Sequence, residues 1–162
     1  LDAGIEDILY LYNSNSYSGV KKLGGFRAAM EAHSVPDYEK RILFYEGDPQ
    51  QMDDVANYLE RLSKKKLSFH GVIASEDPLA IGAMKYARRQ GLCVPEDLSV
   101  IGYNNSMLTT CCTPELTSVD NRLETQTHSA GWQTLLGVLQ GEEMPKKSIF
   151  SGKLIKRGTT LF

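Results

Sequence analysis

The sequence contains 162 residues, of which 41% are apolar and 23% are charged, and its formal net charge at pH 7 is −2. This length favours one domain, or one domain with part of another, and supplies enough apolar residues for a substantial core. A DNA-binding surface normally carries an excess of basic residues, so this charge balance argues against nucleic-acid binding by the chain alone.

The sequence has the features of a cytoplasmic protein with no membrane association. No apolar run reaches the ~18 residues that a membrane-spanning helix requires, and the first residues do not have the pattern of a signal peptide. The three cysteines include the adjacent pair Cys111-Cys112, so we expect reduced thiols rather than a disulfide framework. Because Leu1 is not a methionine, we expect the sequence to begin inside a longer protein.

Strand and helix patterns alternate over roughly the first hundred residues. Short apolar runs predict strands at residues 5–12, 41–45, 71–74 and 98–103. Apolar residues at helical spacing predict helices at residues 19–33, 48–66 and 77–90. Parallel strands are joined by crossover helices, so this order predicts a parallel sheet with helices packed on both faces.

Capping signals mark the ends of these helices. Asp48-Pro49 and Asp77-Pro78 each combine a capping side chain with a proline that suits the first helical turn. Ser18 is expected to cap the first helix in the same way, and Gly91 is expected to end the third.

The pattern changes after residue 103. Residues 106–116 have no clear period and are predicted to form a long connection, followed by a short strand at 116–119. A helix is predicted at 122–140 and a polar turn at 142–147. A last strand at 149–156 and a tail complete the chain.

Polar side chains follow three of the predicted strands. Ser16 and Ser18 follow the first strand, Glu76 follows the third, and Asn104 follows the fourth. Ligands of parallel sheets bind beyond the carboxyl ends of the strands, and these groups suit hydrogen bonding to a small polar ligand. The alternative is that such residues are caps and turn formers, but a cap explains neither Glu76 nor Asn104.

The sequence lacks the catalytic and cofactor-binding motifs that are typical of enzymes. It contains no glycine-rich phosphate-binding motif and no G-x-S-x-G motif, and its three histidines are too far apart for zinc-ligand spacing. We therefore predict no catalytic residue, no metal and no cofactor.

Five segments form an ordered set of motifs that covers nearly the whole chain. They are SGVKKLGGF at 18–26, ASEDPLAIGAM at 74–84, GLCVPEDLSVIGYNN at 91–105, PELTSV at 114–119 and LIKRGTT at 154–160. Together they resemble the effector-binding domain of the lactose-repressor/galactose-repressor family of bacterial transcription regulators. The closing RGTT favours these regulators over their periplasmic sugar-binding relatives.

The resemblance implies a three-layer α/β fold of the periplasmic-binding-protein-like type, with two lobes and a ligand cleft between them. Residues 1–118 would form the C-terminal lobe, residues 119–148 would cross to the N-terminal lobe and add a helix to it, and residues 149–162 would return. The helix-turn-helix headpiece that reads operator DNA would lie outside this chain, with most of the N-terminal lobe.

The resemblance also implies an effector site. The family's effector arginine falls on Lys22, its asparagine after the third strand falls on Glu76, and its aspartate after the fourth falls on Asn104. Lysine keeps the charge of arginine but loses its planar two-pronged donor. With Ser16 and Ser18, these residues are the candidate ligand-binding set. We expect a small polar effector, a sugar or a sugar-like molecule, although the three departures argue against the usual simple sugars.

The family forms dimers through this lobe, and Ala80, Ile81 and Met84 are candidate contacts. If residues 122–140 pack on an absent lobe, four large apolar residues of this helix should be partly exposed or covered by a neighbouring copy. They are Trp132, Leu135, Leu136 and Leu139.

Three functions remain open on the sequence. The leading one is effector binding in a transcription regulator, and the second is solute binding for a transporter. The third, an α/β enzyme, lacks a nucleophile–base pair and a cofactor loop.

Overall fold

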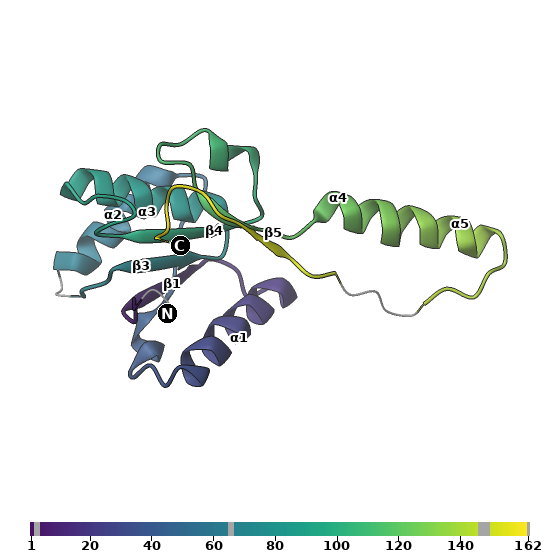
Figure 1. Ribbon diagram of the computed structural model, residues 1–162, viewed down its shortest axis with the longest axis horizontal. Coiled ribbons are helices and arrows are strands. Elements are labelled where there is room, and N and C mark those ends of the chain that lie inside the picture. Colours follow the sequence, from purple (N-terminus) through teal and green to yellow (C-terminus); the bar gives the residue numbers. More distant parts are fainter. Residues whose placement is uncertain (2–3, 65–66, 146–149, 162) are drawn as a thin grey trace.

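The chain forms one six-stranded sheet with helices on both of its faces (Figure 1). The computed structural model describes residues 1, 4–64, 67–145 and 150–161. The strand order is β2-β1-β3-β4-β5-β6; the first five strands are parallel and β6 is antiparallel to β5. The strands are β1 Ile8–Tyr12, β2 Ile42–Phe44, β3 Gly71–Ala74, β4 Ser99–Tyr103, β5 Thr117–Asp120 and β6 Lys153–Ile155. The fold class predicted from the sequence is confirmed.

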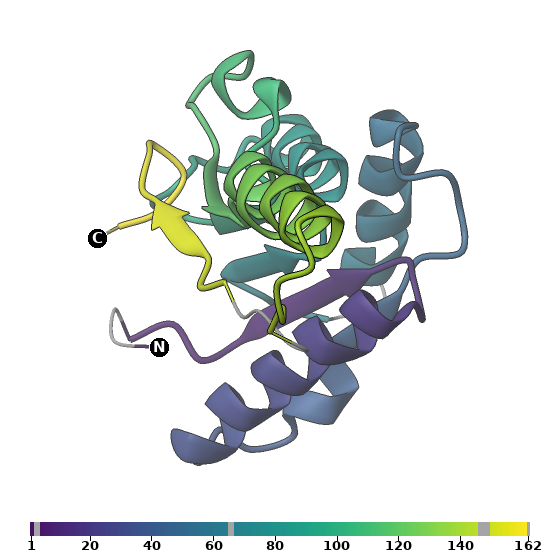
Figure 2. The same ribbon diagram turned by 90° about the vertical axis from the view of Figure 1, so that its right-hand side faces the viewer.

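Three helices flank the sheet and a fourth helical segment extends from it. The elements are α1 Tyr17–Ala32, α2 Met52–Lys64, α3 Asp77–Gln90 and the consecutive segments α4 Leu123–Gln126, η3 Thr127–Trp132 and α5 Gln133–Leu139, with short 3₁₀ turns η1 Tyr38–Arg41 and η2 Met107–Thr110. Helices α2 and α3 pack on one face of the sheet and α1 lies on the other (Figures 1 and 2).

Side chains that alternate along the central strands contribute to a separate core on each face of the sheet. In β1, Leu9 and Leu11 belong to the larger core beneath α2 and α3, whereas Ile8 and Tyr10 belong to the smaller core beneath α1. Successive strand residues point to opposite faces, so one continuous apolar run serves both cores.

The helix starts differ from the predictions at three points, the first two of which are in α1 and α2. Helix α1 begins at Tyr17 and its N-cap is Ser16, whose Oγ accepts a hydrogen bond from Gly19 N at 3.2 Å, so the prediction of Ser18 as the cap is wrong. Helix α2 begins only at Met52, because Asp48 forms a turn in which its Oδ1 accepts from Gln50 N at 2.9 Å. At the end of α3 the prediction is confirmed: Gly91 has a φ of 71° and caps the helix.

Asp77 ties three elements together instead of capping α3. Glu76 holds the N-cap position, so the prediction of Asp77 as the N-cap is wrong. The Asp77 carboxylate is fully buried and accepts hydrogen bonds from Ser106 N at 2.7 Å and Ser118 Oγ at 2.6 Å. A side chain at Gly102 would collide with this carboxylate, which explains the glycine in β4.

The last residues of the chain are fastened to the sheet. Arg157 donates to Leu116 O at 2.8 Å and to Asn105 Oδ1 at 2.7 Å, and Thr159 Oγ1 donates to Val100 O at 2.7 Å. Part of the predicted turn at 142–147 and the first residue of the predicted strand at 149–156 lie outside the described residues.

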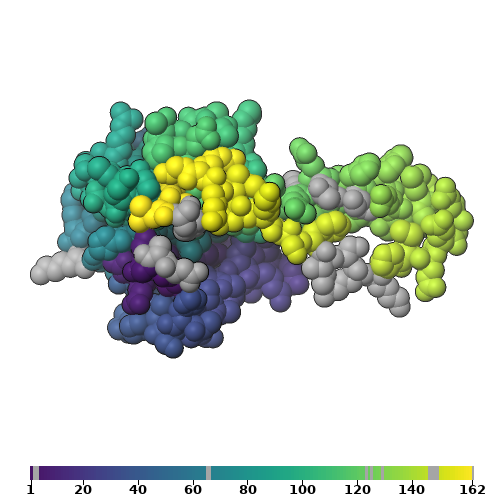
Figure 3. Space-filling model, viewed as in Figure 1, coloured from purple at the N-terminus to yellow at the C-terminus, as the bar shows by residue number. Residues whose placement is uncertain are grey.

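Segments α4, η3 and α5 form an arm that projects away from the sheet (Figures 1 and 3). The exposed fractions of its large apolar residues are 56% for Trp132, 51% for Leu135, 37% for Leu136 and 74% for Leu139. The predicted exposure of all four is therefore confirmed. Such a surface is normally covered by protein in a soluble molecule.

The three candidate dimer contacts on α3 lie inside the lobe. Ala80 is fully buried, and Ile81 and Met84 are also buried in the larger core. Their side chains are already packed, so they offer little surface to a second copy.

We predict that Asp77→Ala lowers the free energy of unfolding by about 2–4 kcal/mol, because the buried Ser118 hydroxyl and the partly buried Ser106 N–H both lose a charged acceptor. Urea denaturation of the chain measures this change. The matched control is Asp53→Ala, whose carboxylate pairs with Lys85 and Arg89 on the surface and should cost less than about 1 kcal/mol. Equal losses in the two variants would contradict the role assigned to Asp77.

Candidate ligand-binding site

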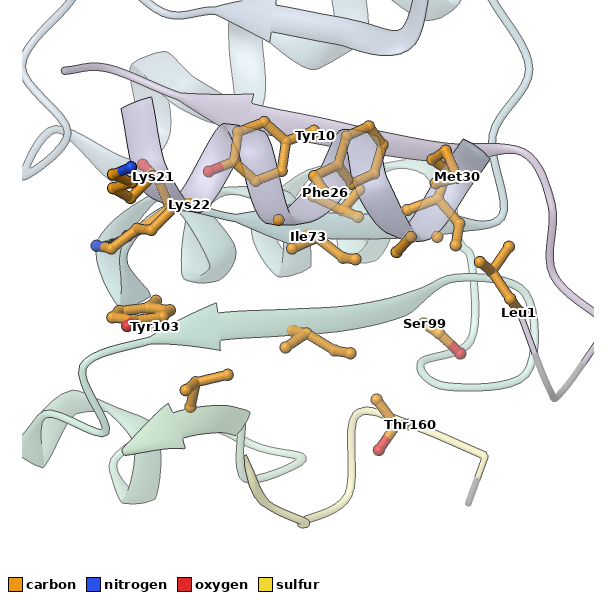
Figure 4. Close-up of a pocket in the computed structure, with 18 of the residues that line it drawn as sticks. Leu1, Tyr10, Lys21, Lys22, Phe26, Met30, Ile73, Ser99, Tyr103 and Thr160 are labelled. Atoms are coloured by element: carbon orange, nitrogen blue, oxygen red, sulfur yellow. Dashed lines mark hydrogen bonds between the residues drawn. The ribbon is translucent and has the colours of Figure 1, made fainter. Parts of the chain in front are cut away.

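Lys22 brings a positive charge to the carboxyl edge of the sheet. Its Nζ donates a hydrogen bond to Ser75 O, just beyond β3, at 2.9 Å, and lies 3.8 Å from the centre of the Tyr103 ring at the end of β4. An ammonium group over an aromatic face is stabilised by the ring quadrupole. Figure 4 shows Lys22 and Tyr103 at the same end of a pocket. Helix α1 therefore supplies the charge, and two strand ends hold it.

Two opposing effects act on the pKa of Lys22. Partial burial lowers the pKa of Lys22, while the nearby carboxylates of Glu76 and Asp77 raise it. The carboxylate of Asp77 is engaged in the hydrogen bonds that fasten η2 and β5. Glu76 has an extended backbone and its side chain makes no capping bond to α3. Glu76 is therefore the acidic side chain beside Lys22 that neither caps α3 nor holds η2 and β5.

Asn104 projects from the turn that follows β4. Its φ is 103°, a region that asparagine tolerates better than most residues, and its side chain is exposed. Asn104 Oδ1 accepts a hydrogen bond from Asn121 Nδ2 at 3.2 Å. The next residue, Asn105, instead holds Arg157 and is structural. The Asn104 amide is thus exposed at the turn, whereas the Asn105 amide anchors Arg157.

Ser16 and Ser18 lie at the start of α1. Both are exposed, and the Ser16 hydroxyl oxygen is already used as the N-cap acceptor. Ser18 borders the same pocket as Lys22.

Direct contacts join only some of the predicted site residues. Lys22 and Glu76 interact electrostatically, and both adjoin Ser75. Within the part of the chain that the structure describes, no hydrogen bond links Ser16, Ser18 or Asn104 to this pair. They surround the same edge because each belongs to a segment that follows a parallel strand.

Sequence reasoning missed Tyr103. Its ring forms the surface on which the Lys22 ammonium rests. The available signal was an aromatic residue at the last position of a predicted strand, directly before Asn104, but the same pattern is typical of ordinary strand packing.

A groove of about 890 Å³ runs from this edge along the face of the sheet beside α1. In Figure 4, Lys22 and Tyr103 mark one end, and Leu1, Ser99 and Thr160 mark the other. Between them the wall is mostly apolar; it includes Phe26, Met30, Ile73, Ile101 and Val119.

Tyr10 stands on this wall with an unsatisfied hydroxyl group. Its side chain is 2% exposed, and its hydroxyl has no hydrogen-bond partner among the described residues. Burial, with smaller effects from Tyr12 and Tyr103, raises the pKa of Tyr10 to about 12.

The described residues contain neither a candidate metal site nor a candidate membrane-spanning helix. Residues 1, 4–64, 67–145 and 150–161 contain no cluster of three histidine, cysteine or acidic side chains that could hold a metal ion. None of the helices in these ranges is long and apolar enough to cross a membrane.

Comparison with known proteins relates the whole chain to bacterial regulators. A family model described as a periplasmic binding protein-like domain matches residues 1–160. An HTH-type transcriptional regulator of Lachnoclostridium phytofermentans is 47% identical over 159 residues, which are 98% of this chain and 46% of that protein. The HTH-type transcriptional regulator AscG of Escherichia coli is 31% identical over 162 residues, which are 99% of this chain and 47% of that protein.

A solved structure agrees with these relatives. A sugar-binding transcriptional regulator of the LacI family from Escherichia coli, complexed with phosphate, matches with a TM-score of 0.86 and 31% identity over 99% of this chain and 56% of that chain. The chain thus spans about half the length of the relatives that it matches.

We predict that Tyr10→Phe raises the free energy of unfolding at pH 7 by about 1 kcal/mol, because the substitution removes a buried hydroxyl without a partner. Chemical denaturation of the chain measures the effect. The control is Tyr38→Phe, which removes the hydrogen bond from Tyr38 Oη to Glu31 at 2.8 Å and should not stabilise the chain.

The same variant has an expected pH signature. An unfolded tyrosine loses its proton near pH 10, while folded Tyr10 keeps its proton until about pH 12. Stability of the native protein should therefore fall as pH rises from 10 to 12, and Tyr10→Phe should show a smaller fall. Parallel pH profiles for the two proteins would contradict the burial assigned to this hydroxyl.

Proposed function

Because the chain belongs to the periplasmic-binding-protein-like domain family, among the lactose-repressor/galactose-repressor regulators, we propose that it binds a small effector as part of a bacterial transcription regulator. The observation that carries this proposal is the charged group at the carboxyl edge of the sheet. There, Lys22 rests on Tyr103 and Ser75 with Glu76 beside it. The edge offers an ammonium donor, carboxylate and amide acceptors and an aromatic face, but no nucleophile paired with a base.

The domain organisation is part of the proposal. Residues 1–118 form the C-terminal lobe, residues 119–148 cross to the N-terminal lobe and contribute a helix to it, and residues 149–162 return. The exposed apolar side of the arm supports this division, because Trp132, Leu135 and Leu139 need a partner surface. The anchoring of Arg157 and Thr159 on the sheet supports the return.

The proposed effector is a carbohydrate or a sugar-like molecule bound by Lys22, Glu76 and Asn104, with Ser16 and Ser18 at the rim. Hydroxyl groups of such a ligand can accept from the Lys22 ammonium and donate to the Glu76 carboxylate. The similar Escherichia coli regulator described as sugar-binding supports this class. The Lys22 ammonium is a compact charge and lacks the planar bidentate donor set of an arginine guanidinium, so it suits a ligand that presents a single oxygen.

Regulation would follow from closure of two lobes around the effector. Binding that favours one lobe arrangement shifts the population of DNA-binding states in the longer protein. In this proposal a headpiece outside the chain contacts operator DNA, the protein is a cytoplasmic homodimer, and it is not an enzyme. Its relatives are named transcriptional regulators, which argues against the alternative of a transporter's solute-binding protein.

The test is a thermal-shift screen of the full-length protein against sugars, sugar phosphates and nucleosides. We predict that one class raises the melting temperature, and that Lys22→Ala or Asn104→Ala reduces this shift at least several-fold. The matched control is Lys40→Ala, a surface lysine paired with Asp37 away from the site, which should leave the shift unchanged. Full stabilisation in both site variants would show that the site lies elsewhere.

A further inference from the structure

A second hollow, of about 420 Å³, lies between helix α2 and the end of strand β2. We call it the α2 hollow. The side chains that surround it are those of Phe44, Tyr45, Glu46, Asp54, Tyr58 and Arg61. It shares no lining residue with the groove beside α1, and α2 packs on the opposite face of the sheet from α1 (Figure 2). The α2 hollow is therefore separate from the candidate effector site.

The hydroxyl group of Tyr45 has no protein partner at this hollow. The residue is 6% exposed, and its ring packs edge-on against Tyr58 with 5.5 Å between the ring centroids. Within the described ranges no hydrogen bond engages this hydroxyl, which is not enclosed by protein as the Tyr10 hydroxyl is. A side chain at Gly47 would collide with it, so the glycine leaves room there. Tyrosine hydroxyls at such positions usually form a hydrogen bond, and this one is open to a ligand.

Helix α2 presents two unpaired charges of opposite sign to the hollow. Asp54 and Arg61 are seven residues apart and lie on the same side of the helix. Among the described residues, Arg61 forms neither a hydrogen bond nor an ion pair, and Asp54 accepts one long hydrogen bond, from Asn57 at 3.5 Å. By contrast, Asp53 and Glu60 of the same helix are both paired with basic side chains. The two charges on this side are left to another partner.

A third charge and two phenol groups complete the arrangement. Burial raises the pKa of Tyr45, Asp54 raises it further, and Arg61 opposes this effect. Burial also raises the pKa of Tyr58, which Arg61 lowers and Glu46 raises. The guanidinium thus lies near both hydroxyls, with one carboxylate near each of them.

The size and the charges of the hollow restrict the ligands that fit it. Its volume is in the range of small-molecule sites. Cationic and anionic side chains that surround one space without pairing match a ligand that carries both charges itself. A sugar phosphate has no cationic group, and a peptide end within a chain supplies only one of the two charges. Phe44, which is 38% exposed, adds an apolar surface beside the charged groups.

We propose that the α2 hollow binds a free α-amino acid with a large apolar side chain. The ligand carboxylate accepts hydrogen bonds from Arg61 and the Tyr45 hydroxyl, the ammonium group donates to Asp54 or Glu46, and the side chain packs on Phe44. Side chains on a helix lean toward its N-terminus, which brings Arg61 closer to Asp54 and lets one small ligand reach both. This site goes beyond the proposed function, because it involves neither Lys22 nor the groove beside α1.

The test is titration calorimetry of the full-length protein with L-phenylalanine. We expect saturable binding with a Kd of about 1 mM or tighter. Two analogues each lack one charge: 2-phenylethylamine has no carboxylate, and 3-phenylpropanoate has no ammonium group. Each should bind at least about tenfold more weakly, because a charged group of the protein then loses its partner.

Variants assign the binding to this hollow. Arg61→Gln should weaken L-phenylalanine binding at least about tenfold, and Tyr45→Phe should weaken it about threefold or more. The matched control is Arg88→Gln, at an exposed position of α3 outside the hollow, which should leave the affinity unchanged. Arg61 is also exposed, so its substitution should not change the melting temperature without ligand. Loss of binding in this variant then reports on the site and not on the fold.

Several outcomes would overturn the proposal. They are absence of L-phenylalanine binding at about 10 mM, equal affinity for the three compounds, and full binding by Arg61→Gln. Loss of binding in Lys22→Ala but not in Arg61→Gln would also overturn it, because the amino acid would then occupy the effector site. The effector screen uses other ligands and reports on Lys22 and Asn104, so failure of the proposed function is visible independently of this test.

Discussion

Burial of a parallel sheet on both faces is the constraint from which the other features of this chain follow. Each of the central strands carries apolar residues on both sides, as Leu9 and Tyr10 do in β1. Such a sheet is stable only when protein covers each face. Helices α2 and α3 complete one face, whereas α1 covers only part of the other.

The same arrangement creates the candidate site. Parallel strands end at one edge, so the segments that follow β1, β3 and β4 converge there without any similarity in sequence. The buried Asp77 carboxylate fixes this edge by holding Ser106 and Ser118, which leaves the adjacent Glu76 side chain free to interact with Lys22. Asp77 thus has a structural role, and the ligand-binding role that we propose falls on its neighbour Glu76.

Two apolar surfaces are left uncovered by the residues that the structure describes. The arm exposes Leu135 and Leu139 on a helix that projects from the lobe, while the groove exposes Ile101 on the sheet itself. A free-standing domain of this size would normally bury both surfaces. The relatives that match the chain are about twice its length, which supports the proposal that other parts of a longer protein cover these surfaces.

The sequence by itself determined the fold class and the existence of nearly every strand and helix, because hydrophobic periodicity and capping residues are local properties. The exposure of arm residues such as Trp132 was predicted from the family resemblance, which assigns this helix to a lobe outside the chain. The rule for parallel strand ends also pointed to Glu76 and Asn104 as candidates for one edge of the sheet, and the family resemblance added Lys22. Only the tertiary structure decided that Asp77 is a buried cross-link, that Tyr103 supports Lys22 and that half of a sheet face is open. These features depend on which distant segments share a face, and local pattern carries no information about which partner a side chain meets.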